Sequence, residues 1–154
     1  MKVMSSKIHR IAVLTDDLDK AVEYHSSLFG VSFERTGEAV AEKTGVAVAV
    51  NWQLGIEIVS PVPGSDNPVA KKMVEHLATR GGGIFAAAFS SDDIDADLGR
   101  FEGAGVEHLL TTFTFNEQQL QDEFGGAFKR FEETVLDTFQ ATGAAYALNV
   151  IEDA

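Results

Sequence analysis

The stretch RIAVLTDDLD at residues 10–19 occurs a second time, in altered form, as AAAFSSDDID at residues 86–95. The two copies lie 76 positions apart, and each joins a short apolar run to an Asp-Asp pair and then to an amphipathic segment. The amphipathic segments close on the same dipeptide, Gly30-Val31 in the first copy and Gly105-Val106 in the second. A repeat of this kind indicates two similar structural units in one chain.

Each copy is predicted to begin a module of one strand, one helix and three further strands. Residues 8–14 are β-branched and aliphatic, Asp16 or Asp17 can cap a helix, and the apolar residues that follow recur every three or four positions until Gly30. That spacing predicts a buried helix face made of Leu18, Ala21, Val22, His25, Leu28 and Phe29. Further strands are expected at 31–34, 45–50, 51–59, 84–90, 106–115, 128–136 and 145–151, and further helices at 69–78 and 93–103.

The predicted fold class is therefore α+β, with two tandem βαβββ modules that form a cup-shaped mixed sheet. All three prolines lie in one linker, residues 61–68. We expect residues 1–66 to be the first module with this linker, and residues 67–154 to be a connecting helix and the second module. The run between Asn116 and Phe124 has helix-forming residues where a hairpin connection is expected, and it is either a surface insertion or a lid.

Composition excludes several classes of function. With 12 Lys and Arg against 24 Asp and Glu, the formal charge of −12 disfavours nucleic acid and anionic membranes as partners. There is no cysteine, so disulfides, thiolate metal sites and cysteine nucleophiles are excluded. The sequence shows neither a signal-peptide pattern nor an apolar run of membrane-spanning length, which leads us to expect a cytoplasmic protein.

Three segments carry a resemblance to a known superfamily: DLDKA at residues 17–21, IEIVSP at 56–61 with DNPVA at 66–70, and GGI at 82–84 leading to DDI at 92–94. They resemble the vicinal-oxygen-chelate superfamily of glyoxalase, bleomycin-resistance and extradiol dioxygenase proteins, and most closely the methylmalonyl-CoA epimerases. The resemblance implies a glyoxalase-like fold. It does not specify a reaction, because this fold carries many chemistries.

The resemblance also implies a divalent metal, and the residues at its ligand positions do not suit one. The corresponding positions are Arg10, Glu57, Ala86 and Asn149, where the epimerases have histidines in place of Arg10 and Ala86 and a carboxylate in place of Asn149. Arginine has no lone pair to offer, and alanine has no donor atom. We therefore expect neither a metal nor another cofactor. His9 is one residue away and is expected on the opposite face of its strand. The epimerases' catalytic carboxylate is also missing, because Val46 and Val48 stand on the corresponding strand.

A cation and a carboxylate then take the place of the metal. In one interpretation, Arg10 and Glu57 are a buried ion pair that fills the vacant site. In the other they are the catalytic residues, with Arg10 as an electrophile or anion clamp and Glu57 as a base or hydrogen-bond acceptor. The remaining predicted substrate-binding residues are Asn51, Gln53, Ala86, Ala88 and Asn149.

Three functions remain open for this chain. The first is a metal-independent enzyme that performs proton-transfer, lyase or isomerase chemistry on a small organic acid, an acyl thioester or a natural-product-like molecule. The second is a binding protein of the antibiotic-sequestering type. The third is a metalloenzyme with displaced ligands, including His9 and Glu132 or Glu133. Phenylalanines 113, 115, 128 and 131 either stack on an apolar ligand or form core. We expect a homodimer, because small modules leave sheet edges exposed.

Overall fold

The computed structural model describes residues 7–154, which form two compact units. One unit comprises Arg10–Phe85, and the other joins Ala86–Ala154 to the described residues up to His9. The first part of the chain contains β1 (Ile8–Leu14), α1 (Leu18–Phe29), β2 (Glu34–Arg35), α2 (Glu38–Thr44), β3 (Val46–Asn51), β4 (Ile56–Pro61) and α3 (Pro68–Arg80). The second contains β5 (Gly83–Ser90), α4 (Ile94–Gly103), β6 (Glu107–Thr114), α5 (Glu117–Phe124), β7 (Phe128–Asp137), α6 (Phe139–Thr142) and β8 (Ala145–Asp153).

The two units use the same strand order. In the first it is β2-β3-β4-β1, and in the second the reverse listing gives β6-β7-β8-β5. In both, the first strand pairs in parallel with the last, β1 with β4 and β5 with β8, while the remaining neighbours are antiparallel. The α+β class and the duplicated, mixed-sheet βαβββ pattern predicted from the repeat are confirmed.

The Asp-Asp pairs of the repeat act as predicted. Asp17 is the N-cap of α1 and its Oδ1 accepts a hydrogen bond from the backbone N–H of Lys20 at 3.1 Å. Asp93 does the same for α4, where it accepts from the N–H of Ala96 at 3.1 Å. The same cap at the same point of each unit turns the chain from the first strand into the helix.

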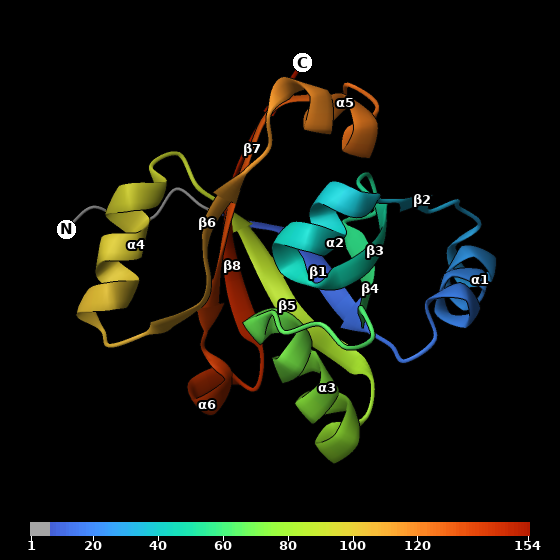
Figure 1. Ribbon diagram of the computed structural model, residues 1–154, viewed down its shortest axis with the longest axis horizontal. Coiled ribbons are helices and arrows are strands. Elements are labelled where there is room, and N and C mark those ends of the chain that lie inside the picture. Colours follow the sequence, from blue (N-terminus) through green and yellow to red (C-terminus); the bar gives the residue numbers. More distant parts are fainter. Residues whose placement is uncertain (1–6) are drawn as a thin grey trace. The chain divides into compact units, whose positions relative to one another are not determined.

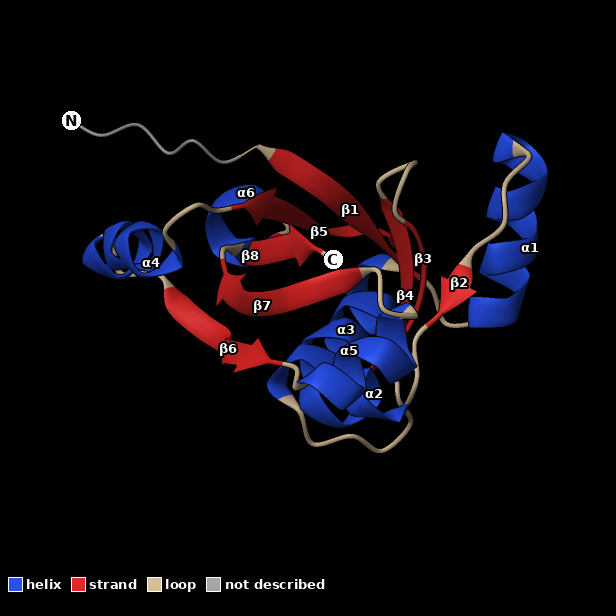
Figure 2. Ribbon diagram, turned by 90° about the horizontal axis from the view of Figure 1, so that it is seen from above, coloured by secondary structure: helices blue, strands red, loops and turns tan. Residues whose placement is uncertain are grey.

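Helices lie on both sides of the strands of the first unit. Figure 2 shows α1 on one side of β3 and β4, and α2 and α3 on the other side. The core contributions are unequal, because α3 buries Val69, Ala70 and Met73 whereas α1 buries no residue fully. Among the residues that the structure describes, no helix is long and apolar enough to cross a membrane.

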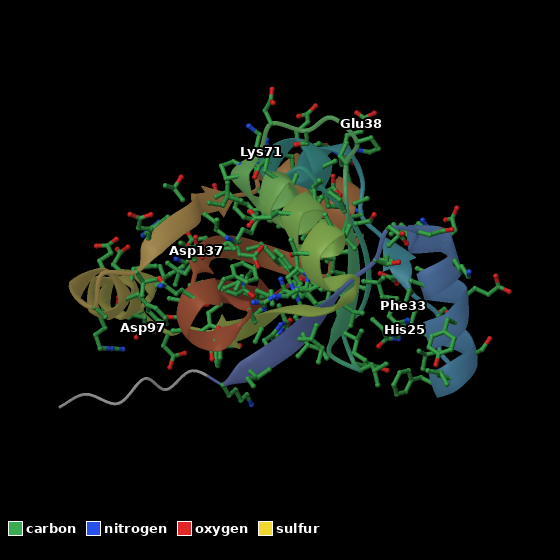
Figure 3. All side chains as sticks on the ribbon, turned by 90° about the horizontal axis from the view of Figure 1, so that it is seen from below. His25, Phe33, Glu38, Lys71, Asp97 and Asp137 are labelled. Carbon is green, nitrogen blue, oxygen red and sulfur yellow. The ribbon has the colours of Figure 1, made fainter. Side chains whose placement is uncertain are left out.

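The prediction of a buried apolar face on α1 is wrong at its C-terminal end. Leu28 and Phe29 are 59% and 47% exposed, and Tyr24 is 62% exposed. The helix contacts its sheet through residues that are only half-buried. One of these is His25, whose Nδ1 lies 2.7 Å from the carbonyl oxygen of Ala21 and whose ring packs edge-on against Phe33 (Figure 3). Helical spacing correctly predicted the helix, but it could not predict how shallowly the helix packs.

Other elements also differ from the sequence prediction. The expected strand at 51–59 is interrupted, because residues 52–55 form the turn between β3 and β4. The expected strand at 31–34 is displaced to β2, and the carbonyl oxygen of Ser32, which precedes β2, accepts a hydrogen bond from the Asn51 side chain. The helix α2 was not expected; it follows Gly37 and ends at Gly45, which has a left-handed φ of 71°.

The second unit has two clusters of core residues, one on each face of its strands. On one, Ile94 and Leu98 of α4 pack with Leu136, Leu148 and Val150. On the other, α5, which connects β6 to β7 (Figure 1), packs against β7 through Phe124. The ring of Phe124 stacks on Phe131 at 5.1 Å and meets Phe115 and Phe128 edge-on. These buried phenylalanines are core, so residues 117–124 are a packed helix.

We expect Phe124→Ala to lower the free energy of unfolding by about 3–5 kcal/mol, since it leaves a cavity among stacked rings. Urea denaturation monitored by circular dichroism measures this free energy. Gln118→Ala on the same helix is the matched control. Gln118 is exposed and its side chain donates a hydrogen bond to Asp122, so its cost should stay within about 0.5 kcal/mol. Equal losses for both variants would contradict the packing of α5.

Candidate functional site

Arg10 and Glu57 meet on one face of the first unit. The Nε–H of Arg10 donates to Oε2 of Glu57 at 3.0 Å, and the side chains are 3% and 16% exposed. The register explains the contact: β1 lies parallel to β4 with Ala12 opposite Glu57, and Arg10 shares a face with Ala12 because strand side chains alternate. The structure thus brings together the two residues that the sequence predicted as catalytic.

Trp52 is a third member of this site that the sequence analysis did not identify. The Cζ atom of Arg10 lies over the indole ring, 5.4 Å from its centroid. Trp52 is the single tryptophan of the chain and stands in the β3–β4 turn. It was missed because residues 51–59 were expected to form one continuous strand. A lone tryptophan between Asn51 and Gln53 was the signal available in the sequence.

Asn51 and Gln53 occupy the same turn but do not join Glu57. Asn51 pairs with Ile56 whereas Val50 pairs with Glu57, so the Asn51 side chain projects from the other face of β3. Its Oδ1 accepts from the N–H of Leu54 at 2.8 Å and its Nδ2 donates to the carbonyl of Ser32 at 2.9 Å. Asn51 thereby fixes the turn. Gln53 is exposed in the turn, and a role of either residue in binding stays a prediction.

The other predicted binding residues belong to the second unit. Ala86 and Ala88 lie on one face of β5, where Ala88 pairs with Ala147 of β8 and Ser90 pairs with Asn149. Ala88 is the residue of the second repeat copy that corresponds to Ala12. Ala12 pairs with Glu57 in the first unit and Ala88 pairs with Ala147 in the second, so Ala147 is the residue that corresponds to Glu57 by strand register. Asn149 is two residues further along the same face and is 1% exposed.

A carboxylate lies beside Asn149. Across the antiparallel pair of β7 and β8, Glu133 is directly opposite Asn149, and opposite residues share a face. A row of paired residues on one face therefore runs across β5, β8, β7 and β6; it consists of Ser90, Asn149, Glu133 and Phe113. Glu132 projects from the other face, where its carboxylate accepts from Arg130 at 3.1 Å. The hydrogen bond from Arg130 to Glu132 is the main cause of the raised pKa of Arg130.

The residues at the expected metal positions do not fit a divalent ion. Arg10 carries a fixed positive charge and donates directly to Glu57, the one carboxylate expected to serve as a ligand. Ala86 has no donor atom, and Asn149 offers a neutral amide where the resemblance implies a carboxylate. Within residues 7–154, no three His, Asp or Glu side chains are grouped as a metal site would require.

The Arg10 and Glu57 pair combines two chemical capacities. The guanidinium is a permanent cation with a planar set of N–H donors, which suits a carboxylate or an enolate oxygen. It stays protonated and so cannot move a proton itself. Glu57 can accept a proton. In a nearly solvent-free position, such electrostatic groups act more strongly on a developing charge than they do in water.

Comparison with known proteins identifies the family. Residues 9–119 match the model of the glyoxalase/bleomycin resistance protein/dioxygenase superfamily, which is more than half of the chain. The protein belongs to this superfamily, as the resemblance predicted. No functionally curated protein matches the sequence.

Solved structures of methylmalonyl-CoA epimerases have the same fold. A variant of the Streptomyces coelicolor enzyme in complex with 2-nitronate-propionyl-CoA is 22% identical, with a TM-score of 0.65 over 96% of this chain and 98% of that chain. A methylmalonyl-CoA epimerase in complex with methylmalonyl-CoA and NH4+ is 21% identical, with a TM-score of 0.67 over 99% and 100%. The Mycobacterium tuberculosis epimerase is 20% identical, with a TM-score of 0.65 over 99% and 93%. At these identities the likeness concerns the fold.

A double-mutant cycle measures the strength of the Arg10 and Glu57 pair. We expect Arg10→Met and Glu57→Gln to show a coupling energy of about 2 kcal/mol in urea unfolding, because each single change leaves the other group poorly solvated. The matched control is the exposed pair Arg35 and Asp19, 46% and 86% exposed, with the changes Arg35→Met and Asp19→Asn. Its coupling should be about 0.5 kcal/mol or less. Equal coupling in the two cycles would contradict the buried pair.

Proposed function

We propose that the protein is a metal-independent enzyme that moves a proton on a small organic acid or acyl thioester. The contact between Arg10 and Glu57 carries the proposal, because a permanent cation and a proton acceptor lie side by side at two positions that, by the resemblance, correspond to metal ligands of the superfamily. The fold shared with methylmalonyl-CoA epimerases supports a thioester as the substrate class.

The proposed chemistry is removal of a proton from the carbon next to a carbonyl group. The C–H bond breaks, the proton goes to the Glu57 carboxylate, and the electron pair moves through the new C=C bond onto the carbonyl oxygen. Arg10 donates hydrogen bonds to that oxygen, which stabilises the enolate. Return of the proton from Glu57 regenerates the carboxylate. An isomerase returns it to a different face or atom, whereas a lyase expels a leaving group from the enolate instead.

Deuterium exchange tests this step without knowledge of the product. We expect the wild-type protein, purified and assayed with a chelator, to exchange the C2 proton of methylmalonyl-CoA or of a related acyl-CoA for deuterium in D2O, followed by proton NMR. Arg10→Met and Glu57→Gln should each slow exchange by about 10²–10³-fold, as expected for loss of an oxyanion donor or a base. Arg35→Met should leave the rate unchanged.

Three outcomes would contradict the proposal. Exchange that the chelator abolishes would favour the metalloenzyme with displaced ligands. Saturable binding of the acyl-CoA without exchange would favour the sequestering protein. Exchange that survives in both site variants would remove Arg10 and Glu57 from the chemistry.

We propose separately that the protein forms a homodimer. Two observations support it: α1 leaves Tyr24, Leu28 and Phe29 exposed, and β6 is the edge strand in the order of the second unit. Exposed strand edges and apolar side chains are commonly covered by association. The cytoplasmic location expected from the sequence stays a prediction.

Light scattering coupled to size-exclusion chromatography measures the oligomeric state. We expect a mass twice that of one chain at micromolar concentration. The mass of a single chain across the accessible concentration range would contradict the dimer and leave the proposal for Arg10 and Glu57 unaffected.

A further inference from the structure

Three large apolar side chains are exposed together on the C-terminal half of α1. They are Tyr24, Leu28 and Phe29, within a stretch of six residues. Tyr24 and Leu28 are four positions apart, so their side chains are neighbours along one stripe of the helix. Of the three helices that the structure describes in the first unit, α1 lies by itself on one side of β3 and β4 (Figure 2). We call this surface the apolar end of α1.

The second copy of the repeat shows that the fold does not require these side chains. Helix α4 packs against β8 as α1 packs against β4, and the offset of 76 positions makes Arg100 the counterpart of Tyr24. By the same offset, the exposed Ala104 corresponds to Leu28. The exposed side of the helix is therefore apolar in the first copy only.

The inner side of α1 is also less covered than that of α4. Three residues of α4 are buried, and their counterparts on α1 are half-buried; the pairs are Ile94 and Leu18, Asp97 and Ala21, and Leu98 and Val22. A helix of 12 residues is marginally stable in water by itself and depends on packing. Helix α1 thus has the most to gain from a contact on its exposed side.

The charge of this surface indicates which partner covers it. Residues 24–33 contain no Asp, Glu, Lys or Arg, although these types make up 23% of the chain and its formal net charge is −12. Two copies of so acidic a chain repel each other, and they repel least where the facing surfaces carry no charge. A basic partner would instead be attracted to the other end of the helix, at Asp16 and Asp17. An uncharged surface rich in aromatic side chains is also typical of the core of an interface.

The edge strand β6 is less suited to contact a second copy. Its pairing with β7 shifts register between His108 and Leu110, and again between Leu110 and Phe113. Such irregularities bend an edge strand and disfavour continuous pairing with another strand. Of the two surfaces that support a homodimer, the apolar end of α1 is therefore the better candidate.

We propose that the apolar end of α1 is the surface on which a second copy of this chain binds, which rests on the homodimer proposed above and names its interface. A two-fold contact uses the same surface on both copies, so the two α1 helices lie against each other across the axis. The chemistry of Arg10 and Glu57 is not involved.

Sedimentation velocity over a concentration series measures the dissociation constant of the dimer. Leu28→Glu places two like charges at the symmetric contact and should raise this constant about 30-fold or more, as loss of a central interface residue does. Val74→Glu is the matched control, because Val74 lies on α3 and is 57% exposed against 59% for Leu28. It should leave the dissociation constant unchanged, and circular dichroism should show both variants folded.

The outcomes separate the interface from the homodimer itself. A wild-type chain that stays monomeric would overturn both. A dimer with the same dissociation constant in wild type and Leu28→Glu would overturn the interface alone, as would equal weakening by Leu28→Glu and Val74→Glu. None of these results bears on the deuterium-exchange assay, which tests Arg10 and Glu57.

Cross-linking measures the same contact without disrupting it. The chain has no cysteine, so a single introduced cysteine can be linked only to its equivalent in another copy. Lys20 and Ser27 are exposed and are helical neighbours of Tyr24. With a short bismaleimide, Lys20→Cys or Ser27→Cys should give a covalent dimer, whereas Val74→Cys should stay a single chain. Absence of cross-linking at both α1 positions, or equal cross-linking at Val74, would overturn the interface even if Leu28→Glu fails to fold.

Discussion

Arg10 carries a permanent positive charge into a position with almost no solvent, and such a charge must be compensated by the protein. Glu57 supplies a hydrogen bond from the neighbouring parallel strand, and Trp52 supplies a ring face from the β3–β4 turn. Both partners depend on local structure: the register of β1 against β4 places Glu57 beside Arg10, and a turn braced by Asn51 and Gly55 carries Trp52.

The two copies of the repeat keep their architecture while their site residues differ. Both begin with a strand, cap the next helix with an Asp, and return the last strand parallel to the first. The position of Arg10 in the first copy is Ala86 in the second, and the register counterpart of Glu57 is Ala147. Small side chains there remove the donors of a metal site. In the second unit, polar side chains on this face lie two residues beyond Ala147 on β8, at Asn149, and opposite it on β7, at Glu133.

Sequence reasoning succeeded where local chemistry decides the structure. The caps at Asp17 and Asp93 and the helix after Asn67 follow from residues that act on their near neighbours. It failed where the outcome depends on packing. Periodicity assigned Leu28 and Phe29 to a core, but helical spacing does not reveal what lies opposite the face. The alternation of apolar and polar residues predicted a strand that includes residues 52–55. The prediction failed because these residues form a turn, and a turn can have the same alternating pattern.

The same limit applies to the candidate site. The pairing of Arg10 with Glu57 could be predicted, since the superfamily resemblance aligned both with one site. Trp52 could not be placed, because its contact with Arg10 depends on the turn, and the turn was read as strand. The sequence also could not show that Asn149 lies two residues beyond the position that corresponds to Glu57. That difference is visible only from the strand register, which no single-sequence pattern specifies.

The central claim is that an arginine held by a glutamate has replaced the superfamily's divalent ion. Its most direct test is the metal content of protein that was purified without chelator, incubated with Co²⁺ or Zn²⁺, and passed through a desalting column before inductively coupled plasma mass spectrometry. We expect far less than one retained ion per chain, and no greater retention than in Glu57→Gln. About one tightly retained ion per chain, lost in Glu57→Gln, would contradict it, since Glu57 would then bind a metal rather than Arg10.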